Sequence, residues 1–191
     1  MAGDKTVCGD GEKRDEQEKI GEGDEVLKVL GEKWMRQQAL RKVTKTAQAV
    51  SFPIHATSIQ RVLVIMPRDL RLIEAAHEFI NQLREQFPYW QVQIFDVDKL
   101  PPEKLNWLGV PRKGYVREIK NQQYDMVIDL NQQVDWLITY LAVMSGAPYR
   151  VHLESANGEF FNIQFKANAS SPFAGLVNAF KRLFITTAVT G

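Results

Sequence analysis

The sequence predicts an α/β fold, a three-layer Rossmann-like sandwich whose sheet is mostly parallel. Short apolar runs alternate along the chain with longer segments of helical periodicity, and turn residues separate the two. A continuous apolar run indicates a strand that is covered on both faces, and strands that alternate with helices form βαβ units. The chain has 191 residues, which is enough to bury a core of this kind.

The first βα unit is the apolar run at residues 61–66, followed by a helix that ends before Pro88. The apolar positions of this helix recur at spacings of three and four residues, and acidic residues occupy the opposite face. The same signals predict further elements, namely strands at 91–97 and 124–130 and helices near 116–121 and at 134–144.

The alternation of strands and helices ends after Tyr149, where apolar and polar residues alternate in two short stretches. A three-residue loop at 156–158 pairs Leu153 with Phe161 and keeps the apolar side chains on one face. We therefore predict a C-terminal hairpin that adds an antiparallel strand at the sheet edge. A last helix is expected after Pro172.

Two segments precede this single domain, which we place at residues 60–188. Residues 1–24 are rich in glycine and charged residues and predict a disordered acidic tail. Residues 25–52 predict a helical segment whose apolar residues fall on two different faces, so we expect a break or two packing partners. Scattered basic residues at 26–48 are typical of a helix packed on its own domain, and less often of one that contacts a membrane surface or a partner.

The composition argues against several classes of function. The net charge of +1 argues against a nucleic-acid partner, and no apolar run approaches the ~18 residues that span a bilayer. Cys8 is the only cysteine, so no disulfide framework forms within the chain, and we expect a cytoplasmic location. The three histidines are isolated in the sequence and no dinucleotide or phosphate-loop motif is present, so we expect no metal and no cofactor.

Polar residues follow the predicted strands at the point where each strand ends. Because the carboxyl ends of parallel strands meet at one edge, these residues are candidates for an anion- or sugar-binding rim. Asp69 and Asn131 also suit helix caps, which is the commoner role for such residues. The candidate ligand-binding residues are Arg68, Asp69, Arg71, Asp96, Asn131 and Gln132.

Four pieces of the sequence together resemble a known family. They are Val62-Leu-Val-Ile65, Leu83-Arg-Glu-Gln-Phe-Pro88, Tyr124-Asp-Met-Val-Ile-Asp-Leu130 and Ala147-Pro-Tyr-Arg150. Their order and spacing resemble glycosyltransferase family 9, which includes the lipopolysaccharide heptosyltransferases. The resemblance covers about residues 61–153 and is to the N-terminal, acceptor-binding half of these two-domain GT-B enzymes.

The sequence departs from this family at the expected catalytic base. The family has a Gly-Asp pair at the start of the helix after the first strand, where this chain has Arg71-Leu72. Asp69, two or three positions earlier, is the one candidate base. The chain also ends before any donor-binding second domain. The resemblance therefore implies a binding or assembly half-domain in envelope-glycan metabolism, without catalysis of its own.

Two other functions stay open. One is a subunit of a heptosyltransferase-like enzyme, completed by a partner chain or a homodimer and using a sugar or nucleotide-sugar ligand. The other is a regulatory domain that responds to phosphate or nucleotides, with Arg68 and Arg71 as its anion site.

Overall fold

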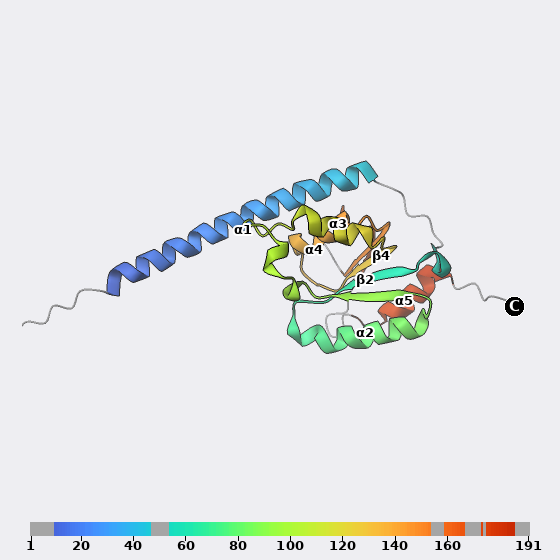
Figure 1. The fold of residues 1–191 in the computed structure, drawn as a ribbon. Coiled ribbons are helices and arrows are strands. Elements are labelled where there is room, and N and C mark those ends of the chain that lie inside the picture. The colour runs from blue at the N-terminus through green and yellow to red at the C-terminus, as the bar shows by residue number, and fades with distance from the viewer. Residues whose placement is uncertain (1–9, 47–53, 154–158, 167–172, 174, 186–191) are drawn as a thin grey trace, which may run out of the picture.

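The computed structural model describes residues 10–46, 54–153, 159–166, 173 and 175–185. Five strands form one sheet in the order β3-β2-β4-β5-β6, and every pairing in it is parallel. This architecture confirms the α/β, Rossmann-like class (Figure 1). The strands are β2 (Arg61–Ile65), β3 (Gln91–Phe95), β4 (Met126–Asp129), β5 (Tyr149–Leu153) and β6 (Ile163–Phe165).

Helices cover both faces of the sheet. One face carries α2 (Ile73–Gln86) and α5 (Leu176–Leu183), and the other carries α1 (Asp10–Thr46), α3 (Lys113–Asn121) and α4 (Trp136–Met144) (Figure 1). Short pieces complete the described chain: strands β1 (Ile54–His55) and β7 (Phe184–Ile185), which pair with each other, and 3-10 turns η1 (Ala56–Ser58), η2 (Leu70–Leu72), η3 (Val97–Lys99) and η4 (Pro102–Lys104).

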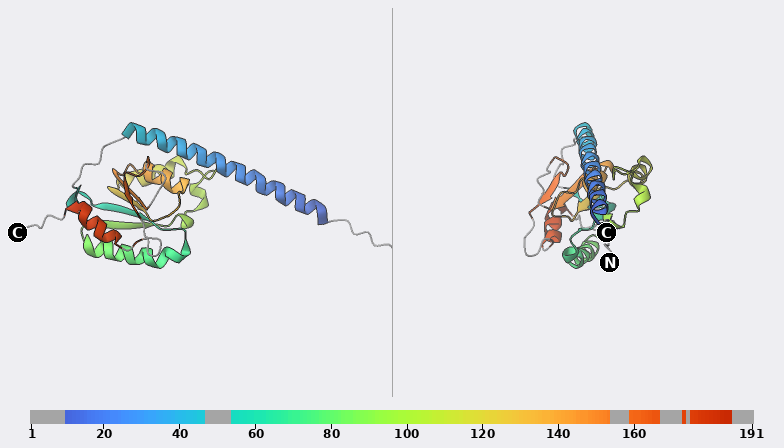
Figure 2. Two further views of the ribbon diagram at one scale, coloured as in Figure 1. Left: turned by 180° about the vertical axis from the view of Figure 1, so that it is seen from behind. Right: turned by 90° about the vertical axis from the view of Figure 1, so that its left-hand side faces the viewer.

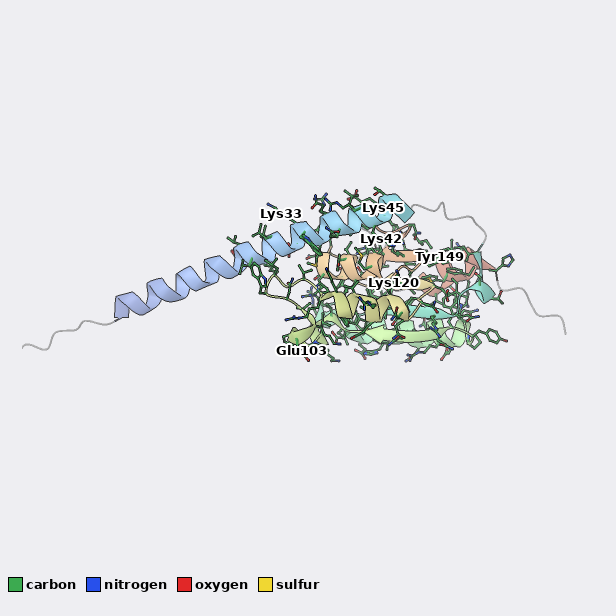
Figure 3. The ribbon with its side chains drawn as sticks, turned by 45° about the horizontal axis from the view of Figure 1, so that its top comes forward. Lys33, Lys42, Lys45, Glu103, Lys120 and Tyr149 are labelled. Carbon is green, nitrogen blue, oxygen red and sulfur yellow. The ribbon has the colours of Figure 1, made fainter. Side chains whose placement is uncertain are left out.

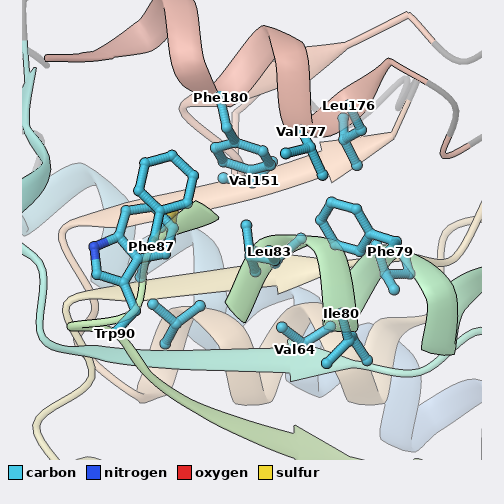
Figure 4. Close-up of a cluster of buried hydrophobic side chains, with 14 of the residues drawn as sticks. Val64, Phe79, Ile80, Leu83, Phe87, Trp90, Val151, Leu176, Val177 and Phe180 are labelled. Atoms are coloured by element: carbon cyan, nitrogen blue, oxygen red, sulfur yellow. The ribbon is translucent and has the colours of Figure 1, made fainter. Parts of the chain in front are cut away.

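The larger core lies between the sheet and helices α2 and α5 (Figure 4). The predicted apolar stripe of α2 faces inward, so that Leu83 is buried near Phe180 of α5. Just after α2, the rings of Phe87 and Trp90 stack with their centroids 4.0 Å apart. The indole Nε1 of Trp90 donates a hydrogen bond to the Ala56 carbonyl at 3.0 Å, so this large ring is buried without an orphan donor.

The predicted antiparallel hairpin is wrong, because β6 runs parallel to β5. The Asn162 side chain fixes this direction: its Oδ1 accepts from the backbone N–H of Arg150, and its Nδ2 donates to the Pro148 carbonyl. Both partners lie at the start of β5, so the start of β6 is held beside the start of β5. Phe160 and Phe161 are buried in the core on the α4 side before β6 begins. The predicted loop at 156–158 lies outside the described residues.

The N-terminal segment is one continuous helix, so the predicted break is not found, while the alternative of two packing partners stays a prediction. Helix α1 begins at Asp10, so the predicted disordered tail is not found at residues 10–24, while residues 1–9 lie outside the described part. The glutamates, lysines and arginines of this segment are good helix formers, which explains its continuation from the packed half. No break separates the two apolar faces of α1. Its C-terminal half packs over α4, and its N-terminal half extends beyond the body (Figures 1 and 2).

Candidate functional site

A cavity of about 370 Å³ opens at the carboxyl ends of β2 and β4. The chain leaves β2 toward β3 on one side and returns to β4 on the other, so the strand order reverses between β2 and β4. Open parallel sheets bind ligands at such a reversal point, in the crevice beyond the strand ends. The cavity is lined by Pro67, Arg68, Asp69 and Leu72 after β2, and by Asn131, Gln132, Gln133, Val134 and Asp135 after β4.

Arg68 lies between two carboxylates at this cleft. One guanidinium nitrogen is 3.1 Å from Oδ2 of Asp135, and another is 3.4 Å from Oδ1 of Asp98. Asp98 follows β3 and Asp135 follows β4, so Arg68 links the loops after three strands. Its positive charge is therefore already matched by protein groups.

Asp135 is also the N-cap of α4, because its Oδ1 accepts the backbone N–H of Ile138 at 3.0 Å. We expect Asp135→Ala to lower the free energy of unfolding by about 1 kcal/mol, because the backbone N–H of Ile138 in the first turn of α4 loses its acceptor. Asp135→Asn keeps a capping oxygen and should lose clearly less. Chemical denaturation of both variants tests this, and equal losses would show that the charge, rather than the cap, is what matters.

Asp69 caps the η2 turn and is held by Arg71. Its Oδ1 accepts the Arg71 backbone N–H at 3.0 Å, and the Arg71 guanidinium lies 2.6 Å from Oδ2. These hydrogen bonds lower the pKa of Asp69 below its usual value. A carboxylate with a lowered pKa is a weak proton acceptor, so the geometry does not favour Asp69 as a catalytic base. Of the two proposed caps, Asp69 does cap a turn, whereas α4 is capped by Asp135 instead of Asn131.

Asn131 joins the ends of β2 and β4 under the cleft. Its Oδ1 accepts the backbone N–H of Arg68 at 2.9 Å, and its Nδ2 donates to the Met66 carbonyl and to Oδ1 of Asp129. All three hydrogen-bonding groups of this buried amide are thus used within the protein. Asn131 shapes the cleft and holds its two walls together, which leaves little of the side chain for a ligand.

The remaining predicted residues separate into two groups. Gln132 lines the cavity beside Gln133, and both side chains are exposed, with no hydrogen-bond partner among the described residues. Asp96 does not line it: the Asp96 carboxylate caps η3 by accepting from the Asp98 backbone N–H and pairs with Lys99 at 3.1 Å. Arg71 stands outside the lining as the partner of Asp69.

A buried pair that was not predicted from the sequence, Asp129 and His152, lies beneath this site. They are register partners on β4 and β5, each is 1% exposed, and Nε2 of His152 lies 3.3 Å from Oδ2 of Asp129. Burial raises the pKa of Asp129 to about 7, against hydrogen bonds from Asn131 that lower it, and burial also lowers the pKa of His152. Both shifts favour the uncharged forms, so burial favours a neutral pair over an ion pair. The sequence does carry a signal for this pair, because Asp129 is a carboxylate within the otherwise apolar strand β4.

Two kinds of feature are absent from the described part of the chain. No three side chains of His, Cys, Asp or Glu there gather closely enough to hold a metal ion. None of its helices has the length and apolar composition needed to cross a membrane.

A family profile described as "Family of unknown function (DUF6913)" matches residues 32–184. The chain belongs to the DUF6913 family. No curated protein and no solved structure matches it. The DUF6913 match overturns the resemblance to glycosyltransferase family 9. Two of the four pieces behind that resemblance contain the buried strands β2 and β4, whose apolar sequences reflect coverage on both faces of a sheet and recur in unrelated α/β proteins.

Proposed function

We propose that the cleft between β2 and β4 binds a small, neutral, hydroxyl-rich ligand, and that this DUF6913 domain is a binding module. The observation that carries the proposal is that an aspartate side chain caps each of the two turns that begin at the cleft. Asp69 occupies the start of η2, and Asp135 occupies the start of α4. The first N–H groups of these turns, which would otherwise attract a phosphate, already donate to carboxylates.

The charges around the cleft support the same conclusion. Arg68 and Arg71 are outnumbered by Asp69, Asp98 and Asp135, and each arginine is paired with at least one of them. A phosphate or nucleotide would have to displace these carboxylates or approach a net negative rim. A neutral polyol would instead donate to the carboxylates and exchange hydrogen bonds with the amides of Gln132 and Gln133. The same charges argue against the phosphate-responsive regulator.

The size of the cavity suits this class of ligand. A volume of about 370 Å³ lies at the lower end of small-molecule sites, which matches a ligand of monosaccharide size. The binding-module interpretation no longer includes envelope-glycan metabolism, because that link depended on the overturned resemblance. We keep the cytoplasm as the proposed compartment on the basis of the single cysteine.

The test is a thermal-shift and calorimetric screen of the full chain with neutral monosaccharides and polyols, with inorganic phosphate and a nucleotide in parallel. We expect at least one neutral compound to raise the melting temperature, and Gln132→Ala with Gln133→Ala to weaken its binding at least tenfold. Gln82→Ala, on the exposed side of α2, is the matched control and should bind like the wild type. Stabilisation by phosphate alone, lost in Arg68→Ala, would favour the regulator instead.

A further inference from the structure

The cleft between β2 and β4 is not polar throughout. Three of the residues that line it are apolar, namely Pro67 and Leu72 after β2 and Val134 after β4. Pro67 is buried, whereas Leu72 is partly exposed and Val134 is 37% exposed. A wholly polar ligand would use the amides and carboxylates of the cleft and would leave these two open apolar side chains without a partner. The cleft therefore offers apolar contacts as well as hydrogen bonds.

A further leucine is exposed beside the same cleft. Leu70 is 82% exposed, the largest value among the large apolar residues of the described chain. It lies in the η2 turn between Asp69 and Leu72, which both line the cavity. Residues three apart in a 3-10 turn lie one above the other, so Leu70 points about a third of a turn away from these two. A ligand therefore reaches Leu70 only by extending out of the cavity.

We propose that the hydroxyl-rich ligand proposed for this cleft is amphipathic, an inference that rests on the proposed function. Its hydroxyl-rich head occupies the cavity, and an apolar alkyl or aryl substituent leaves it over Leu72 and Val134 and packs against Leu70. A cavity of about 370 Å³ suits a head of monosaccharide size, so a substituent has to extend past the rim. The chemical class of the ligand is thus an alkyl or aryl glycoside, or the ether of a polyol.

The expected gain in affinity follows from the apolar surface that the substituent removes from water. Each fully buried methylene group adds up to about fourfold in affinity. Contact with three side chains at an open rim buries each group only in part, so the gain per methylene is smaller. A hexyl glycoside should still bind about tenfold more tightly than the methyl glycoside of the same sugar.

Tyr89 provides a matched control, because it is also exposed but lies far from the cleft. It is 80% exposed and precedes β3, at the amino ends of the strands. Figure 3 labels a residue near each end of the sheet: Glu103 in η4 lies beyond the carboxyl end of β3, and Tyr149 begins β5. The five residues of β3 span about 17 Å, which is more than a hexyl chain covers. A substituent that leaves the cavity cannot reach Tyr89.

Isothermal titration calorimetry of the full chain tests the proposal with paired methyl and hexyl glycosides of glucose, galactose and mannose. For a sugar that binds, we expect the hexyl glycoside to have a Kd about tenfold lower than the methyl glycoside. Leu70→Ser should remove most of this gain and leave the Kd of the methyl glycoside unchanged. Tyr89→Ser should keep the gain.

The possible failures separate this inference from the proposed function. Equal affinities for the methyl and hexyl glycosides of a sugar that binds would overturn the amphipathic ligand and leave the hydroxyl-rich ligand in place. A gain that survives in Leu70→Ser would also overturn it, because the chain would then lie elsewhere on the protein. Binding of 1-hexanol as tight as that of the hexyl glycosides, without binding of any methyl glycoside, would overturn both, as would a lack of binding by every compound.

Discussion

Replacing Gly31 with alanine is expected to destabilise the protein, although alanine is the better helix former. A Cβ atom built at Gly31 lies 2.1 Å from the carbonyl oxygen of Leu108, so α1 and the loop at 105–111 must move apart. An ordinary Gly→Ala change inside a helix gains about 1 kcal/mol, whereas overpacking of this kind costs about 1–3 kcal/mol. Because the obstacle is backbone rather than a flexible side chain, we expect the cost to exceed the gain.

The matched control is Gly114→Ala in α3. A Cβ there meets nothing within 4 Å, so the same change should be neutral or mildly stabilising. Urea denaturation measures both variants against the wild type. If Gly31→Ala proved as stable as Gly114→Ala, the close approach of α1 to the 105–111 loop would be wrong.

Replacing Asp129 with asparagine is expected to change how stability depends on pH. In the unfolded chain the carboxyl titrates near its usual value of 3.8, whereas burial raises the folded pKa to about 7. Between these values the folded state binds more protons than the unfolded state, so wild-type stability from this group falls as pH rises. Asp129→Asn removes that titration. The variant should therefore gain stability relative to the wild type by up to about 1.4 kcal/mol per pH unit between pH 4 and pH 7.

His152 acts in the opposite direction over part of this range. Because the pKa of His152 is lowered, the folded state binds fewer protons than the unfolded state below the usual value of 6.5. The contribution of His152 to the free energy of unfolding therefore falls as pH falls. Comparing Asp129→Asn with the wild type at each pH largely removes this second effect, because both proteins keep His152. Urea denaturation at several pH values gives the comparison. A difference that does not vary with pH would mean that Asp129 stays ionised when folded.

The sheet could be predicted from the sequence because its strands are buried on both sides. The apolar sequences of β2 and β4 are typical of strands covered on both faces, and the stripe of α2 follows directly from its spacing. The hairpin could not be predicted correctly. Phe161, Ile163 and Phe165 alternate with polar residues like one strand, but Phe161 is buried together with Phe160 before β6 begins. The helix at 10–24 was missed because its composition resembles a charged tail.

The candidate site was only partly predictable. Parallel topology brings the polar residues after β2 and β4 to the same edge of the sheet. Arg68, Asp69 and Gln132 do line one cavity there. Some of these side chains are already paired with protein groups from another loop, as Arg68 is with Asp135. No spacing in the sequence indicates such pairs between loops. Asp135 itself carried a signal, because an aspartate directly before an apolar helix is a strong N-cap candidate.

The most direct measurement of ligand binding is an NMR titration of the isotopically labelled chain with the best neutral monosaccharide or polyol, repeated with inorganic phosphate. We predict that the neutral ligand shifts amide signals at 67–72 and 131–135, the two segments that line the cavity, and that phosphate at the same concentration leaves them in place. Shifts produced by phosphate around Arg68 and Arg71, with none from any neutral compound, would contradict a cleft built for a hydroxyl-rich ligand.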